Sequence, residues 1–170
     1  LGQSLRPLGM QVLQGSSGGG SSSARGATQV VPGGVVAVQL VRGDVSIAAT
    51  GTVTYVEGQR LVAFGHPLMG LGDAQLPLAT GGSVRFMSSR ASGFKLAWPG
   101  LEVGMMTGDR QAGIVGERGQ KAPMIPVWVE LTTATGTSQQ VLSRKRYQIE
   151  VASHPMLSPL FLASAVNGML

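Results

Sequence analysis

The chain has 170 residues, the size of one globular domain, so it can bury a core but leaves no room within it for a multidomain enzyme. Hydrophobic residues make up 43% of the chain, charged residues 12%, and glycine occurs 26 times, a composition too apolar for a disordered chain and too rich in glycine for a helical bundle. The net charge is +5, but aromatic residues make up only 5% and the basic residues are scattered, apart from Arg144-Lys145-Arg146, which we interpret as a solvated strand end; this distribution argues against nucleic-acid binding.

The first 31 residues divide into two segments. Residues 1–14 carry a short amphipathic pattern interrupted by Pro7 and Gly9, typical of the remnant of an upstream element. Residues 15–31 begin with a glycine- and serine-rich run that buries too little apolar area to offset its ordering entropy, so we predict a flexible linker. The folded domain is expected over residues 32–170. Because the chain begins without an initiator Met or a secretion-signal pattern, we expect it to be an excerpt or a processed piece.

From residue 36 the hydrophobic pattern has a period of two, which predicts strands. Val36, Val38 and Leu40 alternate with their neighbours, and Gly43-Asp44 provides a turn. A β-rich run over residues 45–56 then reaches Glu57-Gly58, which predicts a hairpin turn into a strand over residues 61–64.

The last third of the chain predicts two more strands and a helix. Apolar residues alternate over 125–131 and again over 147–151, and the small and hydroxyl residues 132–138 between them suit a hairpin loop. After Pro159, apolar residues recur with helical spacing, which predicts a closing helix over 160–170 whose apolar face is Leu162, Ala165, Val166, Met169 and Leu170. We therefore expect a mainly β protein, a Gly-rich β-barrel with a short C-terminal helix.

His66 stands out as a candidate for chemistry. It follows an apolar strand and a glycine, Gly65, that we interpret as a point of close backbone approach, and Pro67 then fixes the exit of the chain. An imidazole presented at the rim of a sheet can take and return a proton near neutral pH. The alternative is a structural histidine with satisfied hydrogen bonds at the end of a strand.

The segment TGTVTYVEGQRLVAFGHPL around His66 resembles the histidine region of the sporulation stage IV protein B serine-peptidase family. The resemblance extends to PGGVVAVQLVRGDVSIAATG, GDRQAGIVGERG and PMIPVWVEL, so it covers residues 30–155, and it is closest to a branch found as a domain in larger bacterial exported proteins. It implies a chymotrypsin-like barrel, His66 as the general base, peptide bonds of exported proteins as the substrate, and a location outside the cytoplasm, in the periplasm or beyond the cell.

A chymotrypsin-like triad also requires an acid that orients the histidine. Asp109 suits this role in chain order and spacing, and the alternative for it is an ordinary surface turn formed by residues 107–110. Asp73 lies closer to His66 in sequence, but its glycine-rich surroundings are typical of a turn aspartate.

The chain contains no clear candidate for the nucleophilic serine. The family pattern places it in a Gly-Xaa-Ser-Gly turn well beyond the histidine, and no such turn occurs here. We interpret the serines that come nearest to consideration as turn or capping hydroxyls: Ser83, Ser88, Ser89, Ser92, Ser138, Ser153 and Ser158.

Two hypotheses follow. In the first, the chain is the histidine-bearing part of a peptidase whose serine lies beyond Leu170. In the second, the fold has lost its chemistry and serves as a structural or protein-binding module in a larger assembly, in which exposed strand edges or the closing helix dock a neighbouring subunit. In either case the partner is a polypeptide, and oligomerisation fits the second hypothesis.

No cofactor or metal site is predicted. The chain has no cysteine, and its two histidines, His66 and His154, lie far apart in the sequence. The segment 116–121 is basic and rich in glycine but lacks the phosphate-binding arrangement, so we predict a loop there. The longest apolar stretch is shorter than the roughly 20 residues needed to cross a bilayer, so no membrane span is expected.

Overall fold

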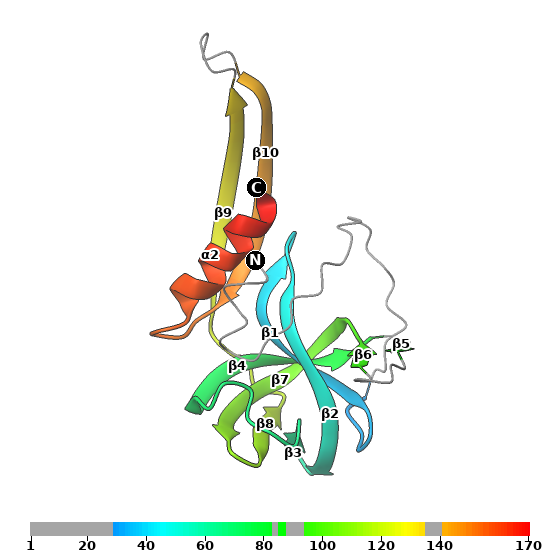
Figure 1. Ribbon diagram of the computed structural model, residues 1–170. Helices are drawn as coiled ribbons and strands as arrows, with labels where there is room; N and C mark the ends of the chain where they lie inside the picture. Colours follow the sequence, from blue (N-terminus) through cyan, green and yellow to red (C-terminus); the bar gives the residue numbers. More distant parts are fainter. Residues whose placement is uncertain (1–28, 83–84, 88–93, 135–140) are drawn as a thin grey trace.

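The computed structural model describes residues 29–82, 85–87, 94–134 and 141–170, and within these ranges the chain is mainly β, as predicted (Figure 1). The one helix within these ranges, α2 (Ser158–Met169), follows the strands. In chain order the strands are β1 (Val35–Gly43), β2 (Ile47–Glu57), β3 (Arg60–Ala63), β4 (Gly72–Gly81), β5 (Arg85–Met87), β6 (Phe94–Leu96), β7 (Pro99–Arg110), β8 (Gly113–Arg118), β9 (Met124–Ala134) and β10 (Val141–Ala152).

Six antiparallel strands form a ring. The order around it is β1, β2, β3, β8, β7, β4, and the ring closes because β4 pairs with β1, which also pairs with β2. β1 is long enough to leave the ring at its end, where Val41 and Gly43 pair with Val151 and Ile149 of β10. The hairpin of β9 and β10 is thereby attached to the ring and projects away from it (Figure 1).

One hydrophobic core joins the ring, the base of the hairpin and the helix. Every strand of the ring contributes a side chain that is fully or almost fully buried, and Ile149 of β10 and Phe161 of α2 belong to the same cluster. The ring residues include Leu40, Val53, Leu61, Leu76, Met106 and Ile114. Since burial of apolar surface is the main favourable term in folding, the ring and the helix stabilise one another.

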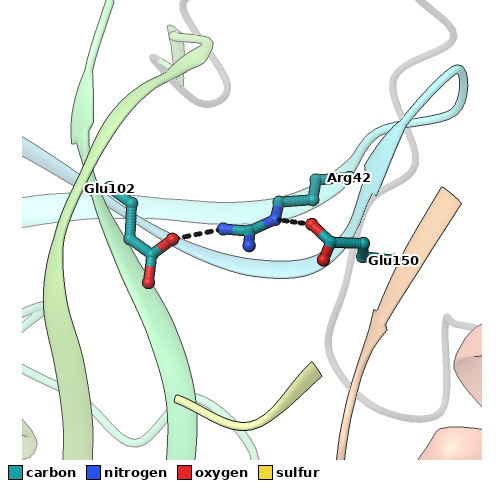
Figure 2. A network of polar contacts seen from close by, with 3 residues as sticks. All are labelled: Arg42, Glu102 and Glu150. Carbon is teal, nitrogen blue, oxygen red and sulfur yellow. Dashed lines mark hydrogen bonds and ion pairs between the residues drawn. The ribbon is translucent and has the colours of Figure 1, made fainter. Parts of the chain in front are cut away.

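An ion triad ties the ring to the hairpin where β1 crosses between them (Figure 2). The guanidinium of Arg42 donates from Nη1 to Glu102 of β7 at 2.5 Å and from Nε to Glu150 of β10 at 2.6 Å. Burial of the guanidinium lowers its pKa, but the hydrogen bonds and charges of Glu102 and Glu150 outweigh burial, so the pKa of Arg42 is raised above its ordinary value. Arg42 is therefore a cation at neutral pH.

Most of the strands and the helix were predicted correctly from periodicity. The patterns over 36–41, 125–131 and 147–151 fall within β1, β9 and β10, and the closing helix is α2. The patterns over 45–56 and 61–64 match β2 and β3, except that β2 begins at Ile47 and β3 ends at Ala63. The Arg144-Lys145-Arg146 triplet is exposed, as expected, but it lies within β10 and not at a strand end. The predictions for residues 1–28, among them the upstream remnant, lie outside the described residues. Val30, near the end of the predicted linker, is only 6% exposed and packs in the core, so the linker prediction is wrong there.

Three interpretations based on glycine are wrong. Residues 107–110 form the end of β7 and Asp109 is buried, so this is no surface turn. Residues 116–118 of the predicted loop belong to β8, and Asp73 lies in β4. Glycine has a different role here: a Cβ on Gly104 of β7 would lie 2.1 Å from the carbonyl oxygen of Glu117 on β8, so the close approach of these strands requires glycine.

The ends of the last elements also differ from prediction. Thr132 and Thr133 continue β9 and are not part of a loop. In α2 the buried residues are Phe161, Ser164 and Ala165, whereas Leu170 is 86% exposed. Leu162 and Met169 of the predicted face also pack against the core, so the buried face overlaps the predicted one and extends to Phe161, the largest buried side chain of the helix.

We expect Arg42→Met to lower the free energy of unfolding by about 1–3 kcal/mol, because it leaves two carboxylates without their shared cation at a partly buried site. Arg146→Met is the matched control, since that side chain is 82% exposed and pairs only with Glu130 of the neighbouring strand; its effect should stay within about 0.5 kcal/mol. Urea unfolding of both variants checks this, and equal effects would contradict a role of the triad at the junction.

Candidate functional site

The segment that carries His66 leaves β3 through two residues with left-handed backbone. Phe64 has a φ of +78°, the one positive value of a non-glycine residue in the described chain, and Gly65 follows with +74°. A bulky residue in this region is strained and persists only where its surroundings hold it. A Cβ on Gly65 would meet nothing within 4 Å, so this glycine is required by its φ and not by close backbone approach, which corrects the prediction.

The ring of Phe64 is held between the sheet and His66. Its backbone N–H donates to the carbonyl of Thr52 at 2.9 Å, and its ring lies where a side chain of residue 51 would stand, since a Cβ on Gly51 would be 2.0 Å from it. The imidazole of His66 packs on this ring, with 5.8 Å between centroids and 50° between planes. The strained backbone thus places an aromatic support beneath the histidine.

The imidazole of His66 is exposed to solvent and has a defined orientation. Its Nδ1 lies 2.8 Å from the carbonyl oxygen of Pro67. Because a carbonyl only accepts, Nδ1 carries the proton of this hydrogen bond. In the neutral ring Nε2 is then the acceptor, and it has no hydrogen-bond partner within the described part of the chain.

Asp109 holds the turn that follows His66. It is 2% exposed and lies near the end of β7, opposite Gly72 at the start of β4. Its Oδ1 accepts from the N–H of Leu68 at 2.7 Å, and its Oδ2 accepts from the N–H groups of Met69 at 2.8 Å and Leu71 at 3.0 Å. A buried carboxylate requires such partners, and three backbone amides provide them.

The two predicted site residues are therefore linked through the chain and not by direct contact. The hydrogen bonds of the Asp109 carboxylate in the described chain all go to the turn over residues 68–71, and the ring of His66 is oriented by Pro67. Asp109 thus acts on the segment next to His66, and the carbonyl of Pro67 occupies the place at Nδ1 where a triad would have its carboxylate.

The other polar candidates have local partners. Asp73 is exposed and forms an ion pair with Arg110. The hydroxyl of Ser158 accepts from the N–H of His154 and donates to the carbonyls of Ala152 and His154, which confirms it as a turn hydroxyl. The Nδ1 of His154 accepts from the N–H of Met156 at 3.3 Å, so His154 is part of the turn before α2. Of the remaining serine candidates, Ser153 lies directly after β10, and Ser83, Ser88, Ser89, Ser92 and Ser138 lie outside the described residues.

A second polar site was missed by the sequence reasoning. A depression of about 310 Å³ lies over the junction of β1 and β10, lined by residues 42–44 and 148–150. It contains Arg42 and Glu150 of the ion triad, and Asp44, whose carboxylate accepts from the N–H of Gln148 at 2.7 Å. No sequence signal brings these residues together, because only the pairing of β1 with β10 does so.

Neither location is built for a metal ion. Among the described residues, no group of three or more His, Asp or Glu side chains is arranged so that it could hold one. No helix in the described ranges is long and apolar enough to cross a membrane.

Comparison with known proteins leaves the family open. No protein-family model, curated protein or solved structure matches the chain. The resemblance to the peptidase family therefore rests on the sequence segments alone.

Asp109→Asn should lower the free energy of unfolding by about 2–3 kcal/mol and speed hydrogen exchange at residues 68, 69 and 71, because an amide side chain has one acceptor oxygen for three donors. Asp73→Asn is the control: it removes an equal charge from an exposed site and should change stability by less than about 0.5 kcal/mol. Unchanged exchange at these three amides in Asp109→Asn would contradict the assigned role.

Proposed function

We propose that the chain is a serine-peptidase-like domain with a chymotrypsin-like barrel, in which His66 is the general base and the substrates are peptide bonds of exported proteins. The observation that carries the proposal is the presentation of His66: an exposed imidazole with its Nδ1 proton engaged and its Nε2 directed to no partner in the described chain. This is the arrangement in which a histidine accepts a proton from a hydroxyl.

The ring of six strands supports the same proposal. The histidine segment leaves the ring at the end of β3 and re-enters it at β4, with Asp109 of β7 beneath it. A site on a turn that is fixed by several strands holds its side chains more precisely than a free loop does.

The chemistry assigned to His66 is proton transfer at Nε2. A serine hydroxyl gives its proton to Nε2 while its oxygen attacks the carbonyl carbon of the scissile peptide, and the resulting imidazolium returns that proton to the leaving amine as the C–N bond breaks. The carbonyl of Pro67 holds the Nδ1 proton through both steps. Asp109 is a positioning residue, because it keeps the turn that begins at Leu68 in place.

The proposal requires a serine from outside the described residues. Ser158 has the local partners of a turn hydroxyl, and no serine hydroxyl contacts the ring of His66 in the part of the chain that the structure covers. The nucleophile is then one of the serines in the undescribed ranges or a serine beyond Leu170.

A second candidate function is a catalytically inactive module that binds protein or supports an assembly. It is favoured because no serine hydroxyl contacts His66 in the described chain. The imidazole already packs on Phe64 and donates from Nδ1 to the carbonyl of Pro67, as a structural histidine would. On this reading the strain at Phe64 serves the rigidity of the turn, and the projecting hairpin is the part that meets other subunits.

Labelling with a fluorophosphonate separates the two candidates. The intact protein should become labelled at serine, and His66→Ala should reduce the labelling rate at least ~100-fold, because the hydroxyl loses its base. His154→Ala is the matched control, since this histidine belongs to the turn before α2 and should leave the labelling rate unchanged.

Two outcomes would reject the peptidase proposal. Equal labelling of the parent protein and His66→Ala would show that the reactive serine does not use this histidine. Absence of labelling in both would favour the inactive module.

A further inference from the structure

The outer strand of the projecting hairpin, β9, has one unpaired edge. β9 ends the strand order of the large sheet and pairs only with β10 among the described strands. In Figure 1 the outer half of the hairpin stands clear of both the ring and α2. An exposed strand edge is a row of free N–H and C=O groups that can accept another strand.

Two hydrogen-bonded contacts establish which residues of β9 face this edge. The N–H of Ser153 donates to the carbonyl of Pro123 at 3.0 Å, which begins the alternation of hydrogen-bonded pairs along β9 and β10. Gln148, the partner of Trp128, turns its backbone the other way, since its N–H and C=O bind Asp44. Trp128, Glu130 and Thr132 therefore present their backbone groups outward.

The outer edges of β9 and β10 differ in how well their charges oppose pairing with another strand. The outer part of β10 carries Arg144, Lys145 and Arg146, all exposed, and such charges oppose the addition of another strand. β9 carries a single charge, Glu130, which already pairs with Arg146 at 2.9 Å. Its edge also presents Trp128, which is 69% exposed.

We propose that β9 pairs antiparallel with β9 of a second copy of this chain, around a two-fold axis at Val129. This pairing rests on the strand edge alone and holds whether or not His66 is catalytic.

The register follows from the chemistry of the strand. With Val129 opposite the second copy's Val129, Trp128 lies opposite the second copy's Glu130, and their outward backbone groups exchange a pair of hydrogen bonds. On the other face, Val127 meets the second copy's Leu131 and extends the half-buried apolar row of each hairpin.

Moving the two-fold axis by one residue in either direction gives a less stable pairing. A shift of the axis toward the tip places Glu130 opposite the second copy's Glu130, and like charges directly opposite one another are destabilising. A shift toward the ring places Pro126 opposite Glu130, where the missing N–H of proline removes hydrogen bonds near the centre. Self-complementarity of β9 is what identifies a second copy as the occupant of the edge.

The absence of cysteine from the chain allows a direct test of this register. Residues directly opposite in a non-hydrogen-bonded antiparallel pair have Cα atoms about 4.5 Å apart, within the range of a disulfide. Val129→Cys in the full chain should therefore form a covalent dimer on mild oxidation. Leu131→Cys is the matched control on the same face, since its Cα would lie roughly 13 Å along the strand from its copy and should not cross-link.

The association itself is measured by sedimentation velocity over a wide range of concentrations. The parent chain should dimerise as concentration rises, because a single strand pairing is a small interface. Glu130→Pro should remain a monomer, since it removes an outward N–H without removing any bond to β10, while Glu130→Gln should still dimerise. Circular dichroism and thermal melting of Glu130→Pro check that the hairpin is still formed.

The proposal is overturned by a parent chain that stays monomeric at every concentration. It is equally overturned if Val129→Cys and Leu131→Cys cross-link to the same extent, or if a folded Glu130→Pro variant dimerises like the parent.

Discussion

A buried carboxylate that accepts three backbone amides organises the candidate site. Asp109 is 2% exposed, and within the described chain its carboxylate accepts hydrogen bonds from the N–H groups of Leu68, Met69 and Leu71, which compensate for its burial. Those donors can converge on one side chain only if the turn between β3 and β4 has a single conformation. The buried carboxylate thereby fixes the conformation of the turn. Pro67 directly precedes this turn, so its carbonyl, which orients His66, is held in place as well.

On the other side of His66 lies Phe64, whose backbone is strained and whose ring supports the imidazole. Phe64 adopts a backbone conformation that a bulky residue avoids. Its N–H donates to the carbonyl of Thr52, and its ring fills the place that a side chain on residue 51 would occupy. The imidazole is thus fixed from both directions, by an aromatic ring beneath it and a carbonyl at Nδ1. The remaining nitrogen faces solvent, which is the property on which the proposed proton transfer depends.

The ring and the hairpin meet at one junction, where β1 pairs with β10 and both parts contribute to one core. Arg42 joins them through two carboxylates that are distant in sequence from each other and from Arg42. One part then carries the histidine, while the other carries a strand edge with almost no charge of its own. A fold of this kind can combine a site on the ring with association through the hairpin, without either interfering with the other.

The sequence predicted the strands whose bulky apolar residues stand at every second position, including β1, although both faces of β1 are buried. It failed at β4, β7 and β8, where both faces are covered or glycine is required inside a strand. Gly104 shows why: it stands in β7 because Glu117 of β8 approaches closely, and from sequence alone such a glycine is indistinguishable from a turn.

For the site, as for the fold, the sequence predicted what depends on local pattern and missed what depends on strand pairing. His66 was found because an apolar strand ends in Gly-His-Pro, and the structure places its ring in solvent. Asp109 was chosen for its order in the chain, but its three amide partners depend on the pairing of β4 with β7, which no local pattern reveals. The partners of Arg42 were missed for the same reason.

The central claim is that His66 presents an unprotonated Nε2 to solvent, and long-range ¹⁵N–¹H NMR of the two imidazoles tests it most directly. At a pH where both rings are neutral, the account predicts the proton on Nδ1 in His66 and on Nε2 in His154, because Pro67 accepts from the first and Met156 donates to the second. A spectrum with the proton on Nδ1 in His66 and on Nε2 in His154 would support the claim. A proton on Nε2 of His66 would contradict it.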